Sequence, residues 1–124
     1  MEKDSRISEG DIMARKEIFD LIDSLYPCYA IGEHQGECTE SYIVLKFDNQ
    51  MQSMNNSQCG WQFVHVFLYV PLSDITLLDD MLKIIQPALR KNLEPTGDIT
   101  PELIDDEKKA YFRRIKYKIP KEVM

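Results

Sequence analysis

The sequence predicts an α+β domain, in which a mostly antiparallel sheet of about four strands carries two helices packed on one face. A helical segment precedes two or three extended segments, and a second helical segment precedes a last extended one. The run at 61–70, WQFVHVFLYV, is apolar on both strand faces, so both of its sides require cover. The 124 residues suit one core, and we expect a flexible segment at 1–10 and a single domain at 11–124.

The first helix is expected at 12–26, where apolar side chains recur at helical spacing. It ends before Pro27, because proline disfavours helical dihedrals in the preceding residue. A short strand at 28–31 follows. A turn-rich segment then leads to a strand at 42–47, YIVLKF, which is β-branched and aromatic.

The polar segment 48–60 is rich in Asn, Gln and Ser and is expected to be a loop. The strand at 61–70 then separates two kinds of side chain. One face carries Val64, Val66, Leu68 and Val70, and the other carries Trp61, Phe63, His65, Phe67 and Tyr69. We expect the aliphatic face to lie under the helices and the aromatic face to meet the curled sheet or a neighbouring subunit.

The second helix is expected at 76–91, where Thr76 and Asp79 have the spacing of a capping box. Pro87 should kink this helix or make it restart. The last strand is expected at 111–119, after turn signals between 95 and 101. Its alternation gives it one solvated, basic face.

Charge is uneven in the C-terminal third. Residues 94–107 include six acidic residues and no basic one, whereas residues 108–121 include seven basic residues and no acidic one. The net charge of −6 argues against a non-specific nucleic-acid binder as a property of the whole molecule. The basic strand could line up donors for phosphates. The favoured interpretation is an edge strand whose charges block unwanted pairing.

Two groups of residues could hold a metal ion, and neither is favoured. His34, Cys38, Cys59 and His65 offer zinc-type ligands but lack a Cys-x-x-Cys spacing. Asp105, Asp106 and Glu107, followed by Lys108 and Lys109, resemble the groups of magnesium-dependent nucleases, but consecutive residues on a turn do not converge on one ion. We therefore expect no cofactor and no metal.

Catalytic signatures are absent from the sequence, which has no glycine-rich phosphate loop, nucleophile elbow or HExxH helix. We expect a protein that is not an enzyme. The polar N-terminus and the lack of a long apolar run favour the cytoplasm. Three cysteines, an odd number without paired spacing, favour reduced thiols.

The order of these patterns resembles one family over residues 11–120. The patterns are SYIVLKF (41–47), CGWQFVHVFLYVP (59–71), TLLDDMLKIIQPALRK (76–91), DDEKK (105–109) and YFRRIKYKI (111–119). Together they resemble the tail terminator, or tail completion, proteins of long-tailed bacteriophages and prophages. The acidic connection EPTGDITP (94–101) departs from the family's shorter one.

The resemblance implies a structural protein that forms a ring, typically a hexamer, at the head-proximal end of the tail tube. Such a protein stops tube growth and joins the tube to the capsid connector, without catalysis. Its partners would be other copies of itself, the tail tube and the connector, with neither a membrane nor a specific nucleic acid. It would occur in the host cytoplasm during assembly and then in the virion.

A ring requires two unlike patches on each subunit. We expect an acidic side made of Asp98, Glu102, Asp105, Asp106 and Glu107. We expect it to approach the next subunit's basic side, made of Arg113, Arg114, Lys116 and Lys118. Trp61, Phe63, Phe67 and Tyr69 would add an aromatic contact, and Met51, Met54, Asn55 and Asn56 would form a partner loop. The alternatives are a small intracellular adaptor or a nucleic-acid-associated protein, with a metal-dependent nuclease less favoured.

Overall fold

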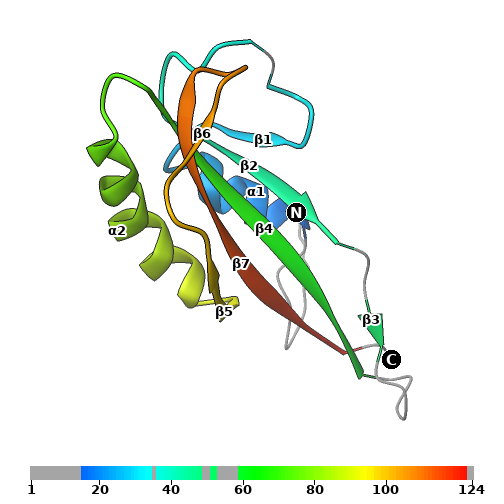
Figure 1. Ribbon diagram of the computed structural model, residues 1–124. Helices are drawn as coiled ribbons and strands as arrows, with labels where there is room; N and C mark the ends of the chain where they lie inside the picture. Colours follow the sequence, from blue (N-terminus) through cyan, green and yellow to red (C-terminus); the bar gives the residue numbers. More distant parts are fainter. Residues whose placement is uncertain (1–14, 35, 49–50, 53–58, 123–124) are drawn as a thin grey trace.

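The computed structural model describes residues 15–34, 36–48, 51–52 and 59–122 (Figure 1). Its elements in chain order are α1 (Arg15–Asp23), β1 (Cys28–Ala30), β2 (Tyr42–Phe47), β3 (Met51–Gln52), β4 (Cys59–Pro71), α2 (Thr76–Arg90), β5 (Glu94–Ile99), β6 (Leu103–Asp105) and β7 (Ala110–Glu122). The segment 1–10, expected to be flexible, lies outside the described residues. Within the described ranges, no helix is both long enough and apolar enough to cross a membrane.

The strands form one sheet in the order β1-β2-β4-β7-β5, with β3 paired to β4 and β6 paired to β7. β1 and β2 are parallel, and the other described pairs are antiparallel. The predicted α+β class and mostly antiparallel sheet are therefore confirmed. The predicted number of about four strands is too low, because the described residues contain seven.

Sequence periodicity does not predict β3, β5 and β6. All six residues of β5 are exposed, so no apolar face marks the strand. Pro95 and Gly97 add turn signals, and Gly97 has a φ of +83°, within an irregular stretch of the β5–β7 pairing. β3 is only two residues long and lies in the segment expected to be a loop. Pairing with a long neighbouring strand, rather than local propensity, creates these short strands.

Both helices pack on one face of the sheet and enclose the main core. Its most buried members come from α1, β2, β4, α2 and β7 and include Ile18, Ile22, Ile43, Leu45, Val64, Val66, Leu68, Val70, Leu78, Met81, Ile85, Leu89, Ile115, Tyr117 and Ile119. The aliphatic face of β4 lies under the helices, as predicted. Burial of each such aliphatic side chain stabilises the fold by about 1.5–3 kcal/mol.

Helix α2 begins at Thr76, as predicted, but its N-cap residue is Ile75, which makes no side-chain cap hydrogen bond. The Oδ1 atom of Asp74 accepts hydrogen bonds from the backbone N–H (3.0 Å) and the hydroxyl of Thr76 in the turn before the helix. The predicted capping box of Thr76 and Asp79 is wrong. The predicted restart at Pro87 is also wrong, because the helix continues to Arg90. Pro87 and Lys83 lie on the exposed side, where water can hydrogen-bond the carbonyl group that proline leaves without a donor.

β4 and β7 pair over 13 residues each, which is longer than either strand predicted from the sequence. In Figure 1 their far ends extend past the two helices, with β3 beside β4. The two described helices therefore cover only part of the length of the sheet.

Candidate functional site

The face of the sheet opposite the helices, called the open face here, has two parts. Cross-strand register orders its side chains in rows from β2 through β4 to β7: Tyr42–Tyr69–Phe112, Val44–Phe67–Arg114, Lys46–His65–Lys116 and Phe63–Lys118. The first row is aromatic, and the next three combine cations with aromatic rings. Basic and aromatic side chains from three strands are thus neighbours on one surface.

The position of β7 overturns one interpretation of its charges. β7 pairs with β4 along one side and with β5 and β6 along the other, so it is an interior strand. The favoured interpretation, that its lysine and arginine side chains block unwanted pairing at a sheet edge, is therefore wrong. An interior strand that carries Arg114, Lys116 and Lys118 on one face needs another explanation.

A chain of hydrogen bonds crosses the open face and fixes the orientation of His65. Arg114 Nη2 donates to Asp98 Oδ1 at 2.8 Å, and Arg114 Nη1 lies 3.2 Å from His65 Nδ1. His65 Nε2 lies 3.0 Å from Asp48 Oδ2. Because a guanidinium group can only donate, Nδ1 is assigned as the acceptor and Nε2 as the N–H that donates to Asp48.

Lys116 lies next to this chain and covers an aromatic ring. Its Nζ atom sits 4.2 Å from the centroid of the Phe63 ring, a cation–π contact. The Lys46 side chain is exposed in the neighbouring row on β2. Lys46 and Lys116 are therefore the cross-strand neighbours of His65 on its two sides.

The aromatic end of the open face is covered by the segment that follows β1. The His34 ring stacks on the Tyr42 ring with centroids 3.9 Å apart, and Tyr42 stacks on Tyr69 at 4.9 Å. Burial raises the pKa of the Tyr42 phenol and raises the pKa of Tyr69 to about 12. Cys38 is buried beside them and donates to the carbonyl oxygen of Glu40. This end of the face is core, not a binding surface.

Among the described side chains, which do not include that of Cys59, the structure does not gather either set of possible metal ligands. His34 stacks in the aromatic cluster, while His65 is held by Asp48 and Arg114. Asp105 Oδ1 accepts from the backbone N–H groups of Glu107 and Lys108, each at 3.1 Å, which closes the turn between β6 and β7. Among the described residues, no group of three or more His, Cys, Asp or Glu side chains converges on a point.

Cys28 and Cys38 are free thiols among the described residues. Burial, with smaller effects from Asp23 and Glu33, raises the pKa of Cys28 to about 12. Its thiol therefore stays protonated at neutral pH and is a weak nucleophile.

One edge of the sheet is formed by β5 and β6, and it carries exposed apolar side chains among acidic ones. Ile99, Leu103 and Ile104 are exposed, Ile104 to 56%. Glu102 and Asp106 are exposed near them. A sheet edge with uncovered isoleucine and leucine side chains is a surface suited to contact with another chain.

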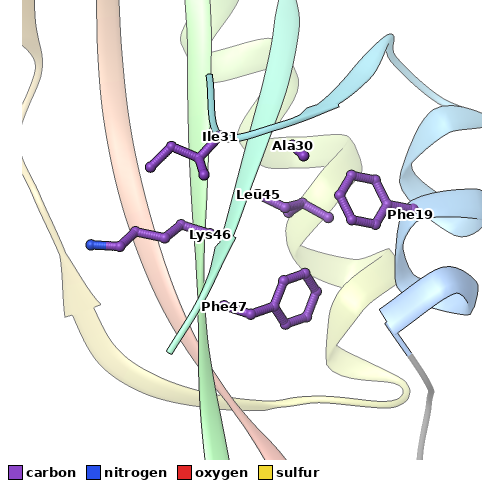
Figure 2. Close-up of a pocket in the computed structure, with 6 residues that line it drawn as sticks. All are labelled: Phe19, Ala30, Ile31, Leu45, Lys46 and Phe47. Carbon is purple, nitrogen blue, oxygen red and sulfur yellow. The ribbon is translucent and has the colours of Figure 1, made fainter. Parts of the chain in front are cut away.

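The opposite edge is formed by β1 and β2, and it contains a cavity of about 260 Å³. β1 ends at Ala30, opposite Leu45, whereas β2 continues to Phe47. Figure 2 shows Phe19 of α1 and Phe47 beside Leu45, with Ile31 and Lys46 on the other side of β2. Ile31 is 62% exposed. This edge of the sheet therefore carries a hollow lined mostly by apolar side chains, with Lys46 as its one charged lining residue.

The predicted interface residues are only partly separated in space. The acidic segment pairs with the basic strand within the same chain, and Asp98 forms an ion pair with Arg114. The side chain of Asp105 serves the β6–β7 turn. Contact between the acidic side of one subunit and the basic side of the next stays a prediction, with these two acidic residues already engaged.

The remaining predicted interface residues do not form one surface, and several of them lie outside the described residues. Arg113 lies on the opposite side of β7 from Arg114 and donates to the carbonyl oxygen of Thr100 at 2.9 Å. Tyr69 belongs to the covered aromatic cluster. Met54, Asn55 and Asn56 lie outside the described residues, and the side chains of Met51 and Trp61 are likewise outside the description.

Sequence reasoning missed Asp48, Lys46 and Ile104. Strand alternation places Lys46 on the same face as Val44, which could have marked it as an open-face cation. Nothing local marks Asp48, because its partner His65 is 17 residues away. Ile104 lies in a strand that its own sequence does not predict.

A scan against protein-family models gives no match, and a search of curated proteins finds no relative.

Proposed function

We propose that this chain is a structural protein of the tail terminator or head–tail joining type, whose copies assemble into a ring at the end of a tail tube. The observation that carries the proposal is the contrast between the two edges of the sheet. One edge has protruding apolar side chains among acidic residues, and the other has an apolar hollow with a lysine.

Unlike edges on one subunit favour head-to-tail contact. When a patch meets a different patch on the next copy, the contact repeats and closes into a ring if the rotation permits. Ile104 and Leu103 of one copy would enter the hollow lined by Phe19 and Phe47 of the next. Glu102 would approach Lys46, which gives the contact a charge preference.

The order of elements also supports the resemblance. A strand, a long connection, a second strand, a helix and a final long strand follow one another as in the patterns quoted above. The ends of β4 and β7 that project beyond the helices offer surface for a tube or connector partner.

The test is the molar mass in solution, measured by light scattering over a range of protein concentrations at low and high salt. We expect the molar mass to be a multiple of 14.5 kDa that corresponds to a closed ring. The ring should be visible by electron microscopy. Ile104→Asp should give monomers, because it places a charge in the contact. Ile84→Asp is the matched control, since Ile84 is exposed on α2 and should leave the assembly intact.

A wild-type chain that stays monomeric at high concentration in both salts would contradict the ring. So would a dimer that Ile104→Asp does not dissociate. Capsid and tail genes beside the gene for this chain would support the phage assignment, and their absence would favour an intracellular adaptor with the same edges.

A further inference from the structure

We infer that the basic part of the open face is a binding site for single-stranded nucleic acid, with phosphates along β7 and bases stacked on the aromatic rings of β4. The inference does not rest on the ring, because it uses the face of the sheet rather than its edges.

The first argument is the placement of the cations. Arg114, Lys116 and Lys118 occupy alternate positions on the open face of β7, so they form a line with steps of about 7 Å. Lys46 extends the positive surface across β2. Because β7 is an interior strand, this line has no role in protecting an edge, and a backbone of phosphates is a ligand that matches a row of donors.

The second argument is the position of the aromatic rings between these cations. Phe67 is the cross-strand neighbour of Arg114, and Phe63 is the neighbour of Lys118. Both rings are only half-buried, on a face that neither α1 nor α2, the two helices of the described residues, covers. Sheets with aromatic rings on an open face and helices on the other bind unpaired bases by stacking, whereas a duplex keeps its bases hidden.

The third argument concerns the ammonium group of Lys116. It lies over the Phe63 ring at 4.2 Å and so occupies the place where a base would stack. A lysine side chain has a flexible stem, and its ammonium group can move to a phosphate when a base takes the ring. The cation–π contact thus keeps the ring covered until a ligand arrives.

Acidic side chains lie beside the proposed binding site and reduce its positive charge without neutralising it. Asp98 and Asp48 sit at the two ends of the hydrogen-bonded chain through Arg114 and His65, where they hold the guanidinium and imidazole groups in place. Glu94 is the cross-strand neighbour of Lys118 at the margin. The net charge of −6 therefore coexists with a local positive surface in the rows of Lys46 and Lys116.

The experiment is fluorescence anisotropy with labelled twelve-residue oligonucleotides, (dT)12 and (U)12, titrated with the full chain at several salt concentrations. We expect binding by at least one of them that weakens linearly in log–log form with salt, and the stronger of the two identifies the natural class. A duplex of the same length should bind more weakly.

Two variants and one control locate the site. Lys116→Gln should lower the salt slope by about 1, and Phe63→Leu should weaken binding by about ten-fold through lost stacking. Lys83→Gln makes the same charge change on exposed α2 and should bind as the wild type does. Circular dichroism and urea midpoints verify that each variant folds.

Four results would overturn the inference. The first is no salt-dependent binding by the wild-type chain. The second is equal weakening by Lys83→Gln and Lys116→Gln. The third is a duplex that binds as tightly as the single strands. The fourth is competition by polyglutamate as effective as that by unlabelled oligonucleotide, which would make the face a general binding surface for anionic partners, such as an acidic protein segment.

Discussion

The two faces of β4 show how one strand serves two purposes. Val64, Val66, Leu68 and Val70 lie under both helices and are fully buried. Phe63, His65 and Phe67, which alternate with them, lie among cations on the face opposite α1 and α2. Burial on the first face stabilises the fold, and we expect the half-buried rings and charges on the second to contribute less. This difference supports the inference that the second group of side chains contacts a ligand.

The largest expected effect comes from breaking the helix-covered face. Leu68→Ala removes a side chain that is fully buried between the sheet and the helices, and it should lower the free energy of unfolding by about 2–5 kcal/mol. Urea unfolding followed by circular dichroism measures the loss. Lys46→Ala, on the open face, should change the same quantity by less than about 0.5 kcal/mol. Equal losses would show that the open face is as structural as the other.

Alkaline pH should lower the folding stability through the covered end of the open face, because buried tyrosine side chains lie there. The pKa values of Tyr42 and Tyr69 are raised by burial, the latter to about 12, from an ordinary value near 10. The folded chain therefore holds protons that the unfolded chain has released. Stability is complete below about pH 9 and falls as pH rises toward 12, with a slope of about 1.4 kcal/mol per pH unit for each such group.

The measurement is the urea midpoint between pH 8 and pH 11 for the wild type and for Tyr69→Phe. The variant should lose less stability than the wild type across this interval, because one titrating phenol is gone. Tyr42 remains in the variant and supplies part of the residual slope, together with Cys28, which has a pKa of about 12, and Tyr117, whose pKa burial also raises. A variant with an unchanged slope would contradict the assignment to the aromatic cluster.

The sequence predicts the parts of this molecule that depend on local periodicity. Strand β2 has its predicted bounds, and both helices and the aliphatic face of β4 are where helical and strand spacing place them. The outer strands β5 and β6 are not predicted, because exposed residues leave no alternating pattern. Whether a strand lies inside a sheet or at its edge depends on these unpredicted neighbours.

For the candidate sites as well, the sequence predicts local patterns but not contacts between distant residues. The alternating basic residues of β7 are visible in the sequence. Their interpretation as protection of an edge strand is wrong, because pairing with β5 and β6 makes β7 an interior strand. The ion pair of Asp98 with Arg114 joins residues 16 positions apart on different strands, and the hollow beside Phe19 joins α1 to β2. No short-range pattern can indicate contacts of this kind.

A smaller effect is expected from the ion pair itself. Arg114 and Asp98 are partly exposed, so water and salt screen their attraction. A double-mutant cycle with Asp98→Asn and Arg114→Gln should give a coupling energy below about 1 kcal/mol, and the coupling should shrink further at high salt. A coupling of several kcal/mol would mean that the chain of hydrogen bonds holds the fold together rather than a binding surface.

The central claim is that the aliphatic face of β4 serves stability, while the part of the opposite face that carries Phe63, His65 and Phe67 serves binding. The direct test measures the urea midpoint and the affinity for a single-stranded oligonucleotide on two variants, Leu68→Ala and Lys116→Gln, at a temperature where both are folded. We predict that Leu68→Ala loses stability and keeps its affinity, while Lys116→Gln keeps its stability and loses affinity. Variants in which both quantities change together would contradict the claim.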